Sequence, residues 1–139
     1  MSEFAETITE LLAQHGLRVT MPRKKVFSVL HEAEVPLSPR EVFERAEGID
    51  AVSVYRTLAT FASIGIAQIV TAGFKQKYEL ADTFKPHHHH LQCSKCGALV
   101  DVSSEQLEKL VDAIAQEHGY IGLHHKFELT GVCRRCQSN

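Results

Sequence analysis

The chain has 139 residues, of which 44% are hydrophobic and 23% are charged. This balance is typical of a globular protein and excludes a disordered chain. The formal net charge of −2 excludes a protein that coats nucleic acid through its charge alone. No apolar run approaches the ~18 residues of a membrane span, and the first residues do not resemble a signal peptide. We therefore expect a cytoplasmic protein that does not associate with membranes.

The first half carries four helical patterns followed by two short strands. In order, the predicted elements are helices over about 3–15, from 21, from 39 and over 51–63, and strands over about 66–71 and 77–80. Thr20 and Ser38 are good N-caps for the two middle helices, and Gly65 and Gly73 separate the later elements. The side chains expected to face the core are Phe4, Ile8, Leu11, Leu12, Val26, Phe27, Leu30, Val42, Phe43, Ala46, Val54, Leu58 and Phe61. Helices followed by a hairpin form the order of a winged helix-turn-helix.

The second half predicts a small module with a sparse core. Strands are expected over about 87–92, 98–102 and 127–132. Ser103 and Gln106 form a capping-box pattern that opens a helix, and Gly119 ends it. The apolar face of this helix consists of Leu107, Leu110, Val111 and Ile114. The sequence thus predicts an α+β protein, with a winged helix-turn-helix domain at 1–77 and a smaller α/β domain at 78–139.

A basic cluster lies at the start of the second helix. Arg18, Arg23, Lys24 and Lys25 are close together in the chain, so a local patch that can contact phosphate exists in spite of the acidic total charge. A solvated helix face without a partner would carry the same charges. Charge alone therefore does not decide between these two interpretations.

The four cysteines come as two Cys-x-x-Cys pairs, Cys93 with Cys96 and Cys133 with Cys136. Four thiolates form a closed tetrahedral set that suits Zn²⁺ and leaves no open position for a substrate. A domain this small needs such support, and zinc here would tie its start to its end. We therefore predict a structural zinc site. Two disulfides, a thioredoxin-like redox pair and a four-thiolate iron site are the alternatives.

Four consecutive histidines, His87 to His90, stand just before the first cysteine pair. In a strand, His88 and His90 would point to one face and His87 and His89 to the other. One run could then supply two metal sites, each completed by residues from elsewhere. The nearby carboxylates that would favour Fe(II) or Mn(II) are Glu79, Asp82, Asp101 and Glu108. Solvent-facing histidines are the alternative interpretation.

Three motifs together resemble the ferric uptake regulator (Fur) family over nearly the whole chain. They are Gly16-Leu17-Arg18-Val19-Thr20-x-Pro22-Arg23, Ser53-Val54-Tyr55-Arg56-Thr57-Leu58, and the segment HHHHLQCSKCG at 87–97. Each motif is moderately specific, and the three in this order, closed by the last two cysteines, are highly specific. The resemblance implies a homodimeric transcriptional repressor. Its winged helix would read an AT-rich inverted repeat in double-stranded DNA, and its zinc-stabilised C-terminal domain would dimerise.

The resemblance also assigns roles position by position. DNA binding falls to Arg18, Arg23, Ser53, Tyr55, Arg56 and Thr57. A regulatory Fe²⁺ or Mn²⁺ (or Zn²⁺) falls to Glu79, His88, His90 and Asp101, and an auxiliary metal falls to His87, His89, Glu108 and His125. Metal binding would set the angle between the two DNA-binding lobes of the dimer. We therefore expect a regulator and not an enzyme, with no small organic substrate.

The chain departs from the family pattern at two places. The family usually has a histidine just before the third helix, where this chain has Pro36. The stretch between Glu79 and His88 is longer than usual, which makes Asp82 an alternative to Glu79 as a ligand. The missing histidine disfavours a peroxide-responsive regulator, and the use of all four cysteines for zinc disfavours a zinc-uptake regulator. Iron or manganese sensing is the main expectation, with these two classes and a metal-storage protein as alternatives.

Overall fold

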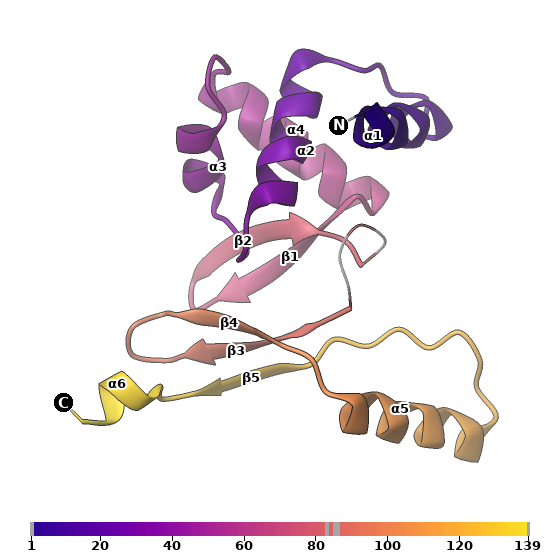
Figure 1. The fold of residues 1–139 in the computed structure, drawn as a ribbon, viewed down its shortest axis with the longest axis vertical. Coiled ribbons are helices and arrows are strands. Elements are labelled where there is room, and N and C mark those ends of the chain that lie inside the picture. The colour runs from indigo at the N-terminus through magenta and orange to yellow at the C-terminus, as the bar shows by residue number, and fades with distance from the viewer. Residues whose placement is uncertain (1, 83, 85–86, 139) are drawn as a thin grey trace. The chain divides into compact units, whose positions relative to one another are not determined.

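The computed structural model describes residues 2–82, 84 and 87–138, and these belong to two compact units, 1–85 and 86–139. The elements of the first unit are α1 (Ser2–Gln14), α2 (Met21–Glu32), α3 (Pro39–Arg45), α4 (Ala51–Ile64), β1 (Ala67–Ala72) and β2 (Lys75–Leu80). In Figure 1 the four helices precede a two-stranded hairpin. This arrangement confirms the predicted winged helix-turn-helix.

Local capping explains where the helices of the first unit begin. The Thr20 hydroxyl accepts a hydrogen bond from the Arg23 N–H at 3.4 Å, as predicted for the N-cap of α2. Ser38 and Glu41 form a reciprocal capping box at α3, with distances of 3.2 and 3.1 Å. Asp50 caps α4 by accepting a hydrogen bond from the Ser53 N–H at 2.8 Å. These starts are dictated by short polar side chains, which is why the sequence indicates them.

The first unit has a hydrophobic core formed by its four helices and the hairpin. Phe27 packs edge-on against Phe61, with ring centroids 6.5 Å apart, and against Phe84 at 5.2 Å. The predicted core residues Ile8, Leu12, Val26, Phe27, Leu30, Val42, Ala46, Val54, Leu58 and Phe61 are all buried. Phe43 was expected inside but is 40% exposed, because the short helix α3 turns Val42 inward and the next position away. The side chain of Phe4 lies outside the described part of the structure.

The hairpin is longer than predicted, and this moves the limit of the first unit. β1 and β2 pair antiparallel from Ala67 opposite Leu80 to Ala72 opposite Lys75. Leu37 adds an isolated bridge to β2, since its N–H donates to Tyr78 O at 2.9 Å and Tyr78 N–H donates back at 2.7 Å. A boundary after residue 77 would cut through β2, and the first unit instead extends to residue 85.

The second unit is a three-stranded sheet with one long helix. Its elements are β3 (His89–Cys93), β4 (Leu99–Val102), α5 (Glu105–His118), β5 (Glu128–Gly131) and α6 (Arg134–Gln137). The strand order is β4-β3-β5, with β4 antiparallel and β5 parallel to the central strand. The cap of α5 is Ser104, one residue beyond the predicted capping box. Within the described residues, none of the side chains of α5 is buried, and its predicted apolar face includes Leu110 at 57% and Ile114 at 48% exposure.

A search of the helices in the described residues finds none that is both long and apolar enough to cross a bilayer.

The capping box of α3 allows a test of the first unit. Ser38→Ala removes the acceptor of the Glu41 N–H and should lower the free energy of unfolding by about 1 kcal/mol. Ser38→Asp is the matched control, because aspartate also accepts at the N-cap and should remain near the wild type. Urea unfolding of the full chain, followed by circular dichroism, measures the difference. Equal stability of Ser38→Ala and the wild type would contradict the assigned cap.

Candidate metal centres and nucleic-acid interface

The two cysteine pairs meet at one end of the sheet of the second unit. Cys93 ends β3, and parallel pairing with β5 places it opposite Gly131, just before Cys133. The four sulfur atoms of Cys93, Cys96, Cys133 and Cys136 lie within 4.8 Å of one another. The Cys96 and Cys133 sulfurs are 3.8 Å apart, and none of the four cysteines is in a disulfide. The structure thus brings together the whole set of predicted sulfur ligands.

The backbone around this cluster favours ionised sulfur. The N–H groups of Lys95, Cys96 and Cys133 point at Cys93 Sγ from 3.4, 3.5 and 3.4 Å. The N–H of Cys133, followed by that of Cys96, lowers the pKa of the Cys93 thiol to about 5. The neighbouring sulfurs, Cys133 first, raise the pKa of Cys136 to about 12. Four crowded thiolates repel one another until a cation joins them, and a closed set of four sulfurs fits Zn²⁺.

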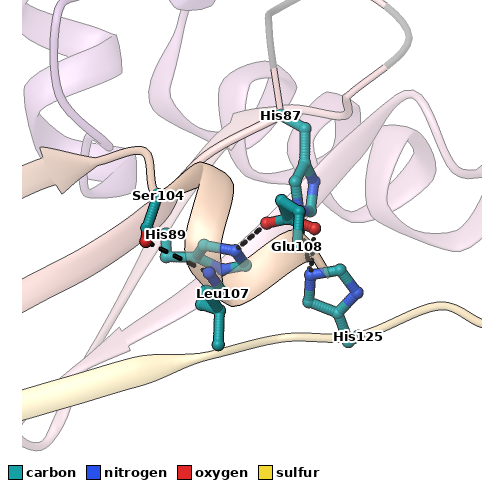
Figure 2. A network of polar contacts seen from close by, with 6 residues as sticks. All are labelled: His87, His89, Ser104, Leu107, Glu108 and His125. Carbon is teal, nitrogen blue, oxygen red and sulfur yellow. Dashed lines mark hydrogen bonds and ion pairs between the residues drawn. The ribbon is translucent and has the colours of Figure 1, made fainter. Parts of the chain in front are cut away.

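A second cluster gathers His87, His89, Glu108 and His125, whose ligand atoms also lie within 4.8 Å of one another. Figure 2 shows the Glu108 carboxylate between the three imidazoles. One carboxylate oxygen lies 2.7 Å from His89 Nε2 and 3.2 Å from His87 Nε2, and the other lies 3.0 Å from His125 Nε2. The contact with His89, and then that with His125, lowers the pKa of Glu108. Three imidazoles and one carboxylate make a mixed donor set that suits a divalent first-row metal.

The N-cap of α5 fixes the position of Glu108. The Ser104 hydroxyl accepts a hydrogen bond from the Leu107 N–H at 3.2 Å (Figure 2). The Ser104 carbonyl accepts one from the Glu108 N–H at 3.2 Å. Glu108 therefore lies in the first turn of α5, where a negative charge is favoured by the helix dipole. The cap is Ser104 and not the predicted Ser103, but Glu108 lies near the start of α5 in either case.

The other two histidines of the run turn to the opposite side. His90 pairs with Asp101 across β3 and β4, and their Nε2 and Oδ1 atoms are 3.7 Å apart. His88 Nε2 lies 4.0 Å from the other Asp101 oxygen, and its ring centroid is 4.8 Å from that of His90. His87 and His89 pair with each other in the same way, at 4.7 Å. The alternation expected of a strand is thus present along the run, although β3 itself begins only at His89.

Glu79, the fourth ligand that the resemblance adds to this set, belongs to the first unit. It lies on β2 with 2% of its surface exposed, and its Oε1 accepts a hydrogen bond from Gln68 Nε2 at 2.7 Å. Gln68 stands directly opposite Glu79 in the hairpin register. Asp82, the alternative ligand, follows the end of β2 and is exposed.

The predicted DNA-binding residues of α4 divide between its two faces. Tyr55, at 55% exposure, and Arg56 lie on the solvent side. Thr57 does not reach this surface, because it is buried at 6% exposure. The Ser53 hydroxyl donates to Asp50 Oδ2 at 2.9 Å and so reinforces the cap. The accessible part of the predicted set on this helix is therefore Tyr55 with Arg56.

Arg18 lies just ahead of α2, and Arg23 lies in the first turn of that helix. The Arg23 guanidinium donates to the Arg18 carbonyl oxygen at 2.6 Å, and the Arg18 side chain is exposed. This hydrogen bond links the two residues at the start of α2. The stretch from Ala51 to Tyr78, which includes α4 and most of the hairpin, contains no aspartate or glutamate. This stretch itself contributes no carboxylate that would repel a phosphate backbone, and the adjacent Asp50 carboxylate is bonded to Ser53 in the cap of α4.

Three residues with functional potential were missed by the sequence analysis. Val52 is 57% exposed beside Tyr55, and helical spacing alone would have placed it on the same face. Gln68 could be connected with Glu79 only once the hairpin register was known. Phe74, at the tip of the hairpin, is fully exposed. An apolar residue is expected to be buried, so the sequence did not indicate this exposure.

A winged helix-turn-helix joined to a four-sulfur cluster and two histidine–carboxylate sets defines a class of metal-binding regulators. The sequence profile of the ferric uptake regulator family matches residues 14–130, so the chain belongs to that family. The chain is 36% identical to the ferric uptake regulation protein of Neisseria gonorrhoeae over 134 residues, which cover 91% of each protein.

Solved structures agree with this assignment. The crystal structure of the Vibrio cholerae ferric uptake regulator matches with a TM-score of 0.73 and 31% identity, over 90% of this chain and 98% of that one. The Pseudomonas aeruginosa regulator with manganese matches with a TM-score of 0.79 and 27% identity, over 91% and 98% of the two chains.

The sulfur cluster leads to a prediction about metal retention. Cys96→Ser replaces a soft ligand with a weak one, so the purified protein should lose the metal that the wild type keeps through gel filtration, and the second unit should lose ordered structure. Ser94→Ala, a change beside the cluster that removes no sulfur, is the control. Metal analysis and circular dichroism measure both effects. Full metal content in Cys96→Ser would contradict a four-sulfur site. A red wild-type protein that contains iron would show that the four sulfurs bind iron and not zinc.

Proposed function

We propose that this member of the family is a homodimeric, metal-responsive transcriptional repressor of the cytoplasm that senses iron or manganese. The observation that carries the proposal is the histidine run, which supplies two separate ligand sets in a chain whose stretch from Ala51 to Tyr78 contains no acidic residue. A storage protein would use the ligands but would leave this stretch without a role. A hydrolase would need a water-activating metal beside a positioned general base in a cleft, and we infer that the chain is not an enzyme.

The DNA-reading role falls to the exposed face of α4. Tyr55 and Arg56 have side chains that can reach base edges and phosphates in the major groove, and Val52 beside them can contact thymine methyl groups. This apolar contact supports an AT-rich operator. Arg18 and Arg23 are proposed to contact the phosphate backbone and fix the register of the helix. Ser53 and Thr57 act by holding α4 in place, through its cap and its buried face.

The second unit supports dimer formation. Val100, Leu91 and Leu129 form one row across β4, β3 and β5, and they are 54%, 41% and 48% exposed. An apolar row of this kind is costly in water and is normally covered by a partner. A second copy of the chain would cover it with the matching row, because two-fold dimers use the same patch on both subunits. The dimer would present two winged helices to an inverted repeat.

The three donor sets suit different metals. The four sulfurs suit structural Zn²⁺, and the sets rich in imidazole and carboxylate suit Fe²⁺ or Mn²⁺. We propose His88, His90 and Asp101 as regulatory ligands, with Glu79 (or Asp82) contributed by the first unit. His87, His89, Glu108 and His125 form the auxiliary site. A regulatory metal that binds residues of both units would select the dimer conformation that fits the operator.

Pro36 bears on how strongly metal and DNA binding are coupled. Leu37 bridges to Tyr78 in antiparallel alignment, which carries Pro36 toward the β2 position of Glu79. Proline offers no ligand atom there, so this chain must couple its metal to the winged helix with one ligand fewer than the family pattern supplies. The peroxide-responsive alternative is weakened by the same substitution, and the zinc-uptake alternative remains open to test.

The experiment is a fluorescence-anisotropy titration of the promoter region of the protein's own gene. Mild chelation that spares the sulfur-bound metal comes first, and Fe²⁺ (without oxygen), Mn²⁺ or Zn²⁺ is then added at fixed salt. We expect Fe²⁺ or Mn²⁺ to tighten binding by tenfold or more, about 1.4 kcal/mol of coupling free energy. Tight binding that ignores all three metals would mean an uncoupled regulator. The absence of binding under any condition would contradict the proposed function.

Two variants assign the roles within this experiment. Arg56→Ala should abolish operator binding without changing zinc content, and Arg45→Ala, an exposed arginine on α3, should bind nearly as the wild type. His90→Ala should remove the response to metal and leave the weak metal-free binding in place. Operator affinity retained by Arg56→Ala would exclude α4 as the reading helix. A full metal response in His90→Ala would exclude the proposed regulatory set.

A further inference from the structure

The hairpin of the winged helix ends in a fully exposed aromatic ring. Gly73, with a φ of 66°, turns the chain between β1 and β2, and Phe74 follows with an exposure of 109%. The hairpin is drawn in Figure 1 as the pair of arrows β1 and β2. Among the other described aromatic rings of this unit, Phe27 and Phe61 are buried and Tyr78 and Phe84 pack against the core, while Phe43 and Tyr55 are partly covered, at 40% and 55% exposure. A ring wholly in water contributes no apolar burial to folding and is open to a binding partner.

The charge around the tip points to a polyanion. Lys75 and Gln76 follow Phe74 and are exposed, whereas Lys77 is already paired with Glu41 at 3.5 Å. No carboxylate occurs anywhere between Ala51 and Tyr78. The tip thus offers one apolar ring beside one available cation. A DNA groove has the matching chemistry, with apolar base faces inside and phosphates along its edges.

The hairpin follows α4 directly in the chain. The chain leaves the helix at Gly65, and the Ile66 N–H donates back to Phe61 O at 2.9 Å, so β1 starts from a fixed point. Each strand of the hairpin has six residues, and at ~3.3 Å per residue the tip projects roughly 20 Å. With α4 in the major groove, an arm of this length is long enough to cross the backbone to the neighbouring minor groove.

We propose that Phe74 is an apolar wedge that enters the minor groove beside each half-site and partly unstacks one base step, with Lys75 against the adjacent phosphate. This inference rests on the proposed DNA-binding function. Flexible pyrimidine–purine steps are the least costly to open. Phe74 therefore confers a preference for such steps at base pairs that α4 does not touch.

The first test compares variants on a duplex selected from a random pool by the metal-loaded protein. Phe74→Ala should weaken binding by about tenfold without changing the dependence of affinity on salt, since it removes stacking and no charge. Lys75→Ala should reduce the salt slope by about one. Val35→Ala, an apolar residue 39% exposed in the same unit, is the control for lost surface and should bind as the wild type.

The second test observes the ring itself. The chain contains no tryptophan, so Phe74→Trp introduces a single reporter that should restore binding. Its emission should be quenched by base stacking and protected from acrylamide when the selected duplex is added. A duplex with 2-aminopurine at the proposed step should brighten with the wild type and stay dark with Phe74→Ala, because unstacking relieves the quenching of the probe.

The outcomes separate this proposal from the one on which it rests. If the wild type fails to select any duplex, the DNA-binding function itself is contradicted. If the wild type binds, Phe74→Ala binds equally well and the tryptophan remains accessible, the wedge alone is excluded. Weakened binding with a tryptophan that stays accessible also excludes insertion, since the ring would then act without entering the groove.

Discussion

The second unit has almost no hydrophobic core, and this constraint governs how the protein works. Among its described residues, 87–138, Cys93 is the single buried hydrophobic residue, and the other buried side chains are His89 and His90. The interior of this unit therefore consists largely of groups that bind metals. Ligation has to replace the apolar burial that holds an ordinary domain together. The apolar side chains of the unit, such as Leu91, Val100 and Leu110, are exposed.

The first unit is built in the opposite way. Its helices pack around Phe27, Leu58 and Phe61, and short polar caps set where they begin. The face of α4 that carries Tyr55 and Arg56 is consequently supported by a core that needs no metal. We interpret this contrast as a division of roles, in which a stable DNA-binding first unit is joined to a second unit whose order depends on its metal ligands. A change in metal supply then alters the second unit first and leaves the shape of the DNA-binding surface intact.

Local rules explain what the sequence could predict. Thr20 and Ser38 mark helix starts because a cap depends on neighbours a few residues away, and the histidine run divides between two faces because a strand alternates. Thr57 was misplaced because a motif was transferred as a block, although its spacing from Val54, Leu58 and Phe61 already put it on the buried face. The contact of Gln68 with Glu79 depends on the hairpin register, and the exposure of Leu110 and Ile114 depends on the tertiary arrangement of the second unit. The short helix α6 begins after Cys133 without a side-chain cap, so no capping residue in the sequence indicates it.

The alternation of His87 to His90 also sets the way in which mutation can alter this protein. Any single substitution in the run damages one donor set and spares the other, because neighbouring positions serve different faces. A deletion or insertion of one codon inside the run would instead disturb both sets at once, because the positions before it change faces relative to those after it. Point changes can therefore tune the two sites independently during evolution, whereas the spacing of this segment is under joint selection from both.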